Sequence, residues 1–274
     1  MIDVLRLVRA NNLLLIAAGV LAGGWIALAA LVTPKTLGFA AVAAAAFGAA
    51  GYALNDVYDA AADRVNRTAR ERPLAGGRVQ RGTADLCVVG GTLVGVAAAA
   101  LVGGAALLVG LAALAVMIGY SPVLKRRGPL GNVTVALTAG LPLLYGALAV
   151  GMPAQGIVPW VLAAWIHLVR EIVKDIADEA GDRVIGRRTL PIIFGPRRAA
   201  VVAAVLAVLF VPVSLGLPAR AHYRAAYYVV ALFAQLAVLL VASRLVSGRL
   251  ERNSLLLKGA MLVGVVALVA GRVA

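Results

Sequence analysis

Two trios of aspartates in this chain share one spacing and could together bind a divalent cation. Both follow the pattern D-x-x-D-x-x-x-D, the second 119 positions after the first, and they consist of Asp56, Asp59 and Asp63, then Asp175, Asp178 and Asp182. On a helix, offsets of three and seven residues return to nearly the same face, so each trio predicts one carboxylate stripe. Two facing stripes repel unless a cation lies between them, and Mg²⁺ held by a few carboxylates usually completes its shell with substrate phosphate oxygens. The spacing therefore indicates metal-dependent chemistry on a phosphorylated substrate.

The segments that must position these aspartates are apolar enough to cross a membrane. Of the 274 residues 62% are hydrophobic and 14% are charged, whereas a soluble domain is about half apolar and a quarter charged. Stretches of about 20 apolar residues, enough to span a bilayer, occur at residues 10–32, 37–55, 83–101, 103–120, 131–150, 156–174, 199–217, 225–246 and 254–271. The sequence thus predicts an all-α integral membrane protein with nine transmembrane helices around a central cavity.

The distribution of basic residues predicts the orientation of these spans. With the N-terminus inside, all but four of the 26 Lys and Arg residues lie on the inner side, the exceptions being Lys35, Arg220, Arg224 and Arg272. This bias favours an N-in, C-out topology in the cell (plasma) membrane, with both trios facing the cytoplasm. The net charge of +14 is therefore explained mainly by the membrane topology, and we expect no nucleic-acid partner. The surplus of positive charge also suits anionic membrane lipids and diphosphate substrates.

The residues around both trios resemble the two signature motifs of the UbiA superfamily of intramembrane prenyltransferases. The first is the run N-D-x-x-D-x-x-x-D that begins at Asn55 and leads to Arg72-Pro73-Leu74; the second, D-x-x-x-D, falls within residues 170–182. The strings at residues 120–125 and 186–191 are also similar to that superfamily. The resemblance covers essentially the whole chain and implies one UbiA-like transmembrane prenyltransferase domain over residues 1–274.

This resemblance implies a magnesium-dependent prenyl transfer. Such enzymes bind an isoprenyl diphosphate donor through Mg²⁺ held between the two aspartate motifs, and an acceptor captures the allylic cation left by ionisation. Matching positions imply these metal ligands: Asn55, Asp56, Asp59, Asp63, Asp175, Asp178 and Asp182. Four of them are expected to be catalytic through the metal, namely Asp56, Asp59, Asp178 and Asp182.

Basic residues on the inner side are candidates for binding the diphosphate. The four that we expect in this role are Arg67, Arg72, Lys125 and Lys174. Any one of them could instead be an ordinary positive-inside anchor. Arg72 and Lys125 are favoured because they fall within motif contexts.

Residues close to the second trio are candidates for contacting the acceptor. His167 lies two turns before that trio, with Arg170 between them, and we expect both at the acceptor site. The alternative for His167 is a core histidine with its hydrogen bonds satisfied. Tyr58, Tyr120 and Asn132 are candidates for lining the cavity, and ordinary interfacial packing explains the tyrosines as well.

The sequence leaves the acceptor open between two chemistries. The strings at residues 170–182 and 9–12 are most similar to the branch of the superfamily that makes ether lipids, which implies transfer from geranylgeranyl diphosphate to the hydroxyl of a prenylated glycerol phosphate. An aromatic acceptor such as 4-hydroxybenzoate or homogentisate is the alternative. A transporter is disfavoured, because its intramembrane charges would lie near the midplane rather than beside basic loops at one face.

Overall fold

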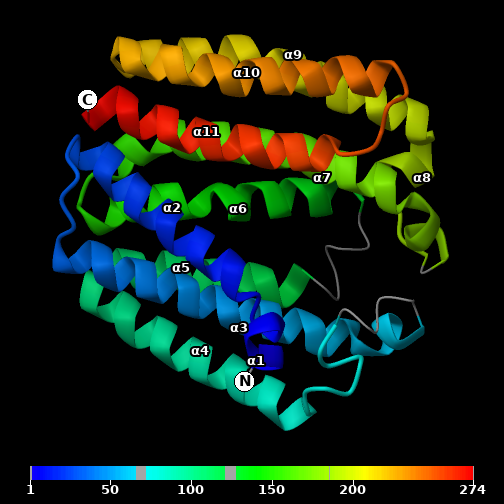
Figure 1. The fold of residues 1–274 in the computed structure, drawn as a ribbon. Coiled ribbons are helices and arrows are strands. Elements are labelled where there is room, and N and C mark those ends of the chain that lie inside the picture. The colour runs from blue at the N-terminus through cyan, green and yellow to red at the C-terminus, as the bar shows by residue number, and fades with distance from the viewer. Residues whose placement is uncertain (1, 66–71, 121–127, 185, 274) are drawn as a thin grey trace.

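The computed structural model describes residues 2–65, 72–120, 128–184 and 186–273, and in these ranges its regular elements are helices (Figure 1). Eight of them are long and apolar enough to cross a membrane. They are α2 (Ala10–Leu28), α3 (Lys35–Val65), α4 (Arg81–Val102), α6 (Pro129–Ala149), α7 (Pro153–Val184), α9 (Pro196–Arg220), α10 (Ala225–Val246) and α11 (Asn253–Val273). The predicted all-helical membrane fold is confirmed.

Three further helices complete the described chain. The apolar α5 (Gly104–Tyr120) occupies the fourth predicted span but is shorter than the other eight. The exact number of nine spans and the N-in, C-out orientation therefore stay predictions. The short helices α1 (Ile2–Leu7) and α8 (Leu190–Phe194) were not predicted, because neither approaches the length of a span.

The buried side chains form two large clusters, each built around one of the helices that carry aspartates. One cluster joins α3 to α2, α4, α5 and α6. The other joins α7 to α9, α10 and α11, with contributions from α2 and α6. In Figure 1, α3, α4 and α5 accordingly lie on one side of the molecule and α9, α10 and α11 on the other, with α2, α6 and α7 between them. The two aspartate trios thus belong to different halves of the bundle.

Glycines allow α2 and α6 to approach closely between these halves. A Cβ atom added at Gly146 would lie 2.8 Å from the backbone N of Gly24 and would also collide with the carbonyl oxygen of Val20. Without a hydrophobic force between helices in lipid, such small residues permit the tight packing that holds spans together. The contact positions α6, and with it α7, relative to the N-terminal helices.

The helices α3 and α7 are the longest in the structure, with 31 and 32 residues. Both continue past their apolar segments into a polar last part, and both end at the same end of the bundle (Figure 1). We call this the acidic end, because the first trio lies in the last part of α3 and the second in the last part of α7. The prediction that each trio lies on a helix is confirmed.

Candidate active site

Asp56 is the buried member of the first trio, with 3% of its surface exposed. The Arg72 guanidinium donates a hydrogen bond of 2.5 Å from Nη1 to Oδ1 of Asp56, and Arg9 donates one of 3.3 Å from Nη2 to the same oxygen. A carboxylate buried this deeply is strongly destabilising unless cations and hydrogen bonds compensate it. The first stripe therefore contains a carboxylate whose charge is balanced by arginines from two distant segments.

Arg9 was not predicted as a site residue, and the N-terminal segment brings it there. It separates α1 from α2 in a left-handed backbone conformation (φ 53°), and its guanidinium lies 4.8 Å from the centre of the Tyr52 ring. The preceding Leu7 is fully buried in a small cluster that includes Leu74 and Val79 of the segment after α3. No local spacing could have revealed this role, because the carboxylate that Arg9 contacts is 47 residues away.

The second trio is likewise held by neighbouring polar groups. Asp182 is buried and accepts a hydrogen bond of 2.5 Å from Nη1 of Arg187. Asp175 accepts one of 2.8 Å from Nδ2 of Asn132, which joins α7 to α6. Asp178 is exposed. Asn132 was predicted to line the cavity, whereas Arg187 was missed, although it lies in a string that is similar to the superfamily.

A second group of charges lies on α7 before the trio. Nζ of Lys174 lies 3.0 Å from both carboxylate oxygens of Glu171, and Nη1 of Arg170 lies 3.5 Å from Oε1 of the same residue. Glu171 is nearly buried and was not predicted as a site residue. The Nε atom of Arg170 is buried without a hydrogen-bond partner among the described residues, and the half-buried His167 lies one turn before Glu171.

Several predicted residues are not brought together by the described part of the chain. Arg67 and Lys125 lie outside the described residues, as do the side chains of Asp63 and Tyr120. Tyr58 is 51% exposed. Asn55 and Asp59 are partly buried on α3 next to the buried carboxylate, and both interact with other groups.

The described side chains contain no group of three or more His, Cys, Asp or Glu residues placed to hold one metal ion. Their donor chemistry nevertheless fits Mg²⁺, which prefers carboxylate and carbonyl oxygens and keeps positions open for substrate phosphate. A metal between the trios would also supply the positive charge that arginines supply within each trio. The metal assignment of the two trios stays a prediction.

These features define a helical membrane protein with two acidic helix ends at one end of the bundle, each with one buried aspartate paired with arginine. Such a site is suited to a substrate with a phosphorylated head and an apolar tail. The family model described as the UbiA prenyltransferase family matches residues 16–258, so the chain belongs to this family. The resemblance read from the two motifs is thereby confirmed.

Individual relatives agree with this membership. The chain is 35% identical over 271 residues to the digeranylgeranylglyceryl phosphate synthase of Methanopyrus kandleri, covering 97% of each chain. It resembles a solved structure of a digeranylgeranylglyceryl phosphate synthase with a TM-score of 0.83 and 22% identity, over 99% of this chain and 98% of that one. A UbiA homologue from Archaeoglobus fulgidus, solved with GPP and Mg²⁺ bound, has a TM-score of 0.66 at 17% identity, with 98% of each chain covered.

Proposed function

We propose that the protein transfers a geranylgeranyl group from its diphosphate to the hydroxyl of a prenylated glycerol phosphate in ether-lipid synthesis, with Mg²⁺ as cofactor. The pairing of the two aspartate trios at one end of a lipid-embedded bundle carries this proposal. This arrangement provides a polar region that would bind the diphosphate and, next to it, apolar helices that would contact the prenyl chain. The name of the Methanopyrus kandleri relative supports this acceptor, and the ligands of the Archaeoglobus fulgidus homologue support an isoprenyl diphosphate donor with Mg²⁺.

The metal would be held by the two trios together with Asn55, and when bound it would stabilise the negative charge that develops on the leaving diphosphate. Arg72 would place a guanidinium beside that diphosphate, since it already lies against Asp56. Arg67, Lys125 and Lys174 would add further positive charge. Fixed cations aimed at developing charge in a site of low polarity are a large source of catalysis.

The reaction breaks the bond between the allylic carbon and the diphosphate oxygen and forms a new bond from that carbon to the acceptor oxygen. The acceptor hydroxyl loses its proton, so the products are the ether, diphosphate and a proton. The acceptor also carries a phosphate, which needs cations of its own. Arg170 suits this role because its buried Nε lacks a partner within the described chain, and His167 on the same helix would lie near the acceptor hydroxyl.

The proposal includes the orientation of the protein in the membrane. The basic residues near the acidic end would face the cytoplasm under the positive-inside rule. Both diphosphate and phosphate head groups would then enter from the cytoplasm, while their apolar chains lie in the bilayer.

The decisive experiment uses the purified protein in detergent with labelled geranylgeranyl diphosphate. Geranylgeranylglyceryl phosphate and 4-hydroxybenzoate are supplied in separate reactions, each with Mg²⁺ and each with excess EDTA. Labelled product only with the glyceryl phosphate, and only with Mg²⁺, is the expected result. Product only with the aromatic acid would move the protein to the synthesis of prenylated aromatics, and release of diphosphate in neither reaction would overturn the proposal.

A further inference from the structure

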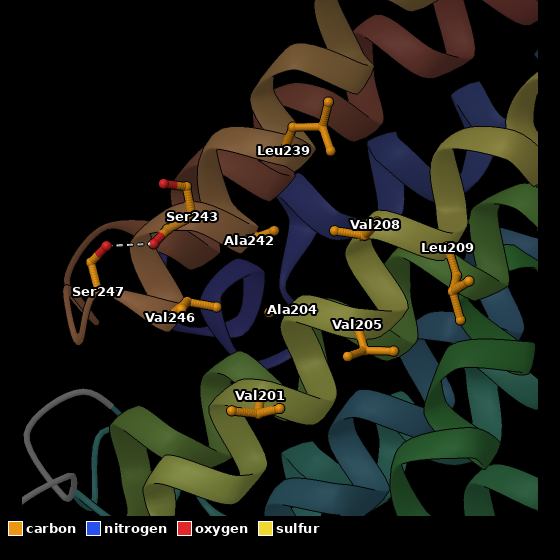
Figure 2. Close-up of a pocket in the computed structure, with 10 residues that line it drawn as sticks. All are labelled: Val201, Ala204, Val205, Val208, Leu209, Leu239, Ala242, Ser243, Val246 and Ser247. Atoms are coloured by element: carbon orange, nitrogen blue, oxygen red, sulfur yellow. Dashed lines mark hydrogen bonds between the residues drawn. The ribbon is translucent and has the colours of Figure 1, made fainter.

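Two apolar grooves flank α9 near the acidic end of the bundle, away from both aspartate trios. The first, which we call the α9–α10 groove, has a volume of about 570 Å³, and Val201, Val205 and Leu239 are among its lining residues (Figure 2). The second, the α8–α9 groove, has a volume of about 240 Å³ and is lined in part by Phe194 and Val202. Two hollows of this kind on a membrane-spanning helix can each accept one apolar chain.

Residues with polar groups are among those that line the two grooves. Ser243 and Ser247 line the α9–α10 groove beside Val246 (Figure 2), and Arg198 lines the α8–α9 groove. The α9–α10 groove therefore becomes polar toward the acidic end, whereas the surface that lines the α8–α9 groove is apolar throughout.

Arg197 adds a second guanidinium at this end of α9. It precedes Val201 by one helical turn and therefore lies on the same face as the lining of the α9–α10 groove. Arg197 and Arg198 are both exposed, and neither forms an ion pair with another residue of the described chain. Guanidinium groups at a membrane surface attract anionic head groups and can bind a phosphate through two hydrogen bonds.

We propose that this end of α9 binds one two-chain anionic phospholipid of the bilayer. The phosphate lies at Arg197 and Arg198, and one chain occupies each groove. Successive residues are about 100° apart around a helix, so the two arginines point toward different flanks of α9, as the two grooves do. A single-chain amphiphile would fill only one groove, and a lipid without net charge would leave the excess positive charge uncompensated.

A second copy of the chain is a poorer occupant of these grooves. A two-fold interface brings the same surface of both copies together. Around this end of α9 it would bring the Arg197 and Arg198 pairs of both copies close to one another, and like charges that lose water repel strongly. The charge of the surface thus favours an anionic lipid.

The test compares lipids in detergent solution without any prenyl substrate, so its outcome does not depend on the proposed reaction. Thermal unfolding is followed by tryptophan fluorescence with added dioleoylphosphatidylglycerol or dioleoylphosphatidylcholine, and native mass spectrometry counts the lipids retained. We expect phosphatidylglycerol to raise the melting temperature more than phosphatidylcholine, with one molecule retained by each chain. This difference should shrink at high salt, because exposed charges are then screened.

Variants separate the head-group contacts from the grooves. The double variant R197Q/R198Q should lose the preference for phosphatidylglycerol, and each single variant should weaken it. The matched control is Arg220→Gln, an exposed arginine at the other end of α9, which should keep the full preference. In the grooves, Val205→Trp and Val202→Trp should each reduce lipid retention, because the larger side chain occupies the space of a lipid chain.

Four results would overturn the proposal. They are equal shifts with both lipids, an equal loss of preference in the Arg220→Gln variant, equal retention of single-chain lysophosphatidylglycerol, and a protein dimer retained in place of the lipid. The last result would assign the grooves to a second copy of the chain. If the double variant does not fold, the two single variants decide the head-group contacts.

Discussion

Nη1 of Arg72 lies 2.5 Å from Oδ1 of Asp56, and this ion pair joins the segment after α3 to the buried carboxylate of the first aspartate trio. The sequence predicted Asp56 as a metal ligand and Arg72 as a diphosphate binder. Their contact places two opposite charges with different expected roles side by side. Because Arg9 reaches the same oxygen, two guanidinium groups compensate the burial of this carboxylate.

The ion pair between Arg72 and Asp56 should contribute measurably to stability. A double-mutant cycle with Arg72→Gln and Asp56→Asn should give a coupling free energy of about 1–2 kcal/mol. Asp56 is buried and Arg72 is partly exposed, so the pair is screened less than a surface pair. Unfolding by sodium dodecyl sulfate in mixed micelles measures this coupling.

The control cycle uses Arg81 and Asp85, whose charged atoms are 3.8 Å apart and whose side chains are 77% and 55% exposed. Its coupling should be close to zero, because exposed pairs contribute little. A coupling at Asp56 no larger than the control would contradict the importance of the buried pair.

Arg9 should stabilise the N-terminal segment. Replacement by Gln removes a cation from Asp56 and the contact with the Tyr52 ring, so we expect a loss of about 1 kcal/mol in the same unfolding measurement. Arg6→Gln is the matched control, since Arg6 is exposed and pairs only loosely with Asp3 across 3.6 Å. Equal losses of stability in the two variants would show that Arg9 contributes only its positive charge and that its contacts with Asp56 and Tyr52 add nothing.

Asp178 should be required for turnover although it is the exposed member of its trio. Asp178→Asn keeps the shape of the side chain but removes the charge needed for Mg²⁺, and we expect a fall in prenyl transfer of at least about 100-fold, as when other groups that stabilise developing charge are removed. Product formation at saturating donor measures this fall, with thermal unfolding to check that the variant folds.

The neighbouring Glu179→Gln serves as the control for Asp178. Glu179 pairs with Arg183, at 2.7 Å, and falls outside the stripe. Turnover should stay within about twofold of the wild type. Near-normal turnover of Asp178→Asn would remove this residue from the metal site.

The close contact between α2 and α6 should make Gly146 sensitive to a single methyl group. Gly146→Ala would place Cβ against the backbone of α2, and overpacking of this kind typically costs about 1–3 kcal/mol. We expect a lower melting temperature in detergent. Gly216→Ala in α9 is the matched control, because a Cβ there would meet no atom within 4 Å, and alanine is the better helix former; a similar loss in both variants would show that the contact is not tight.

The sequence alone was sufficient to predict an all-helical membrane fold and the location of both aspartate trios on helices. The predicted span at residues 225–246 coincides with α10 (Ala225–Val246), and both trios lie on helices. Hydropathy and helical periodicity are local properties, because the cost of placing polar backbone in lipid acts on each segment separately. The short α1 and α8 carry no such signal.

Only the tertiary structure decided which groups meet within the site. Arg9 contacts Asp56, which is 47 residues away in the sequence, and Asn132 contacts Asp175, which is 43 residues away. Helical periodicity predicts no contact between residues so far apart in the chain. These pairs form because buried polar groups need partners and helix packing determines which partners lie within reach. The residue types and their spacing were therefore present in the sequence. The fold supplied Arg9 to the first trio and Asn132 to the second, whereas the arginine that pairs with Asp182 is only five residues away in the chain.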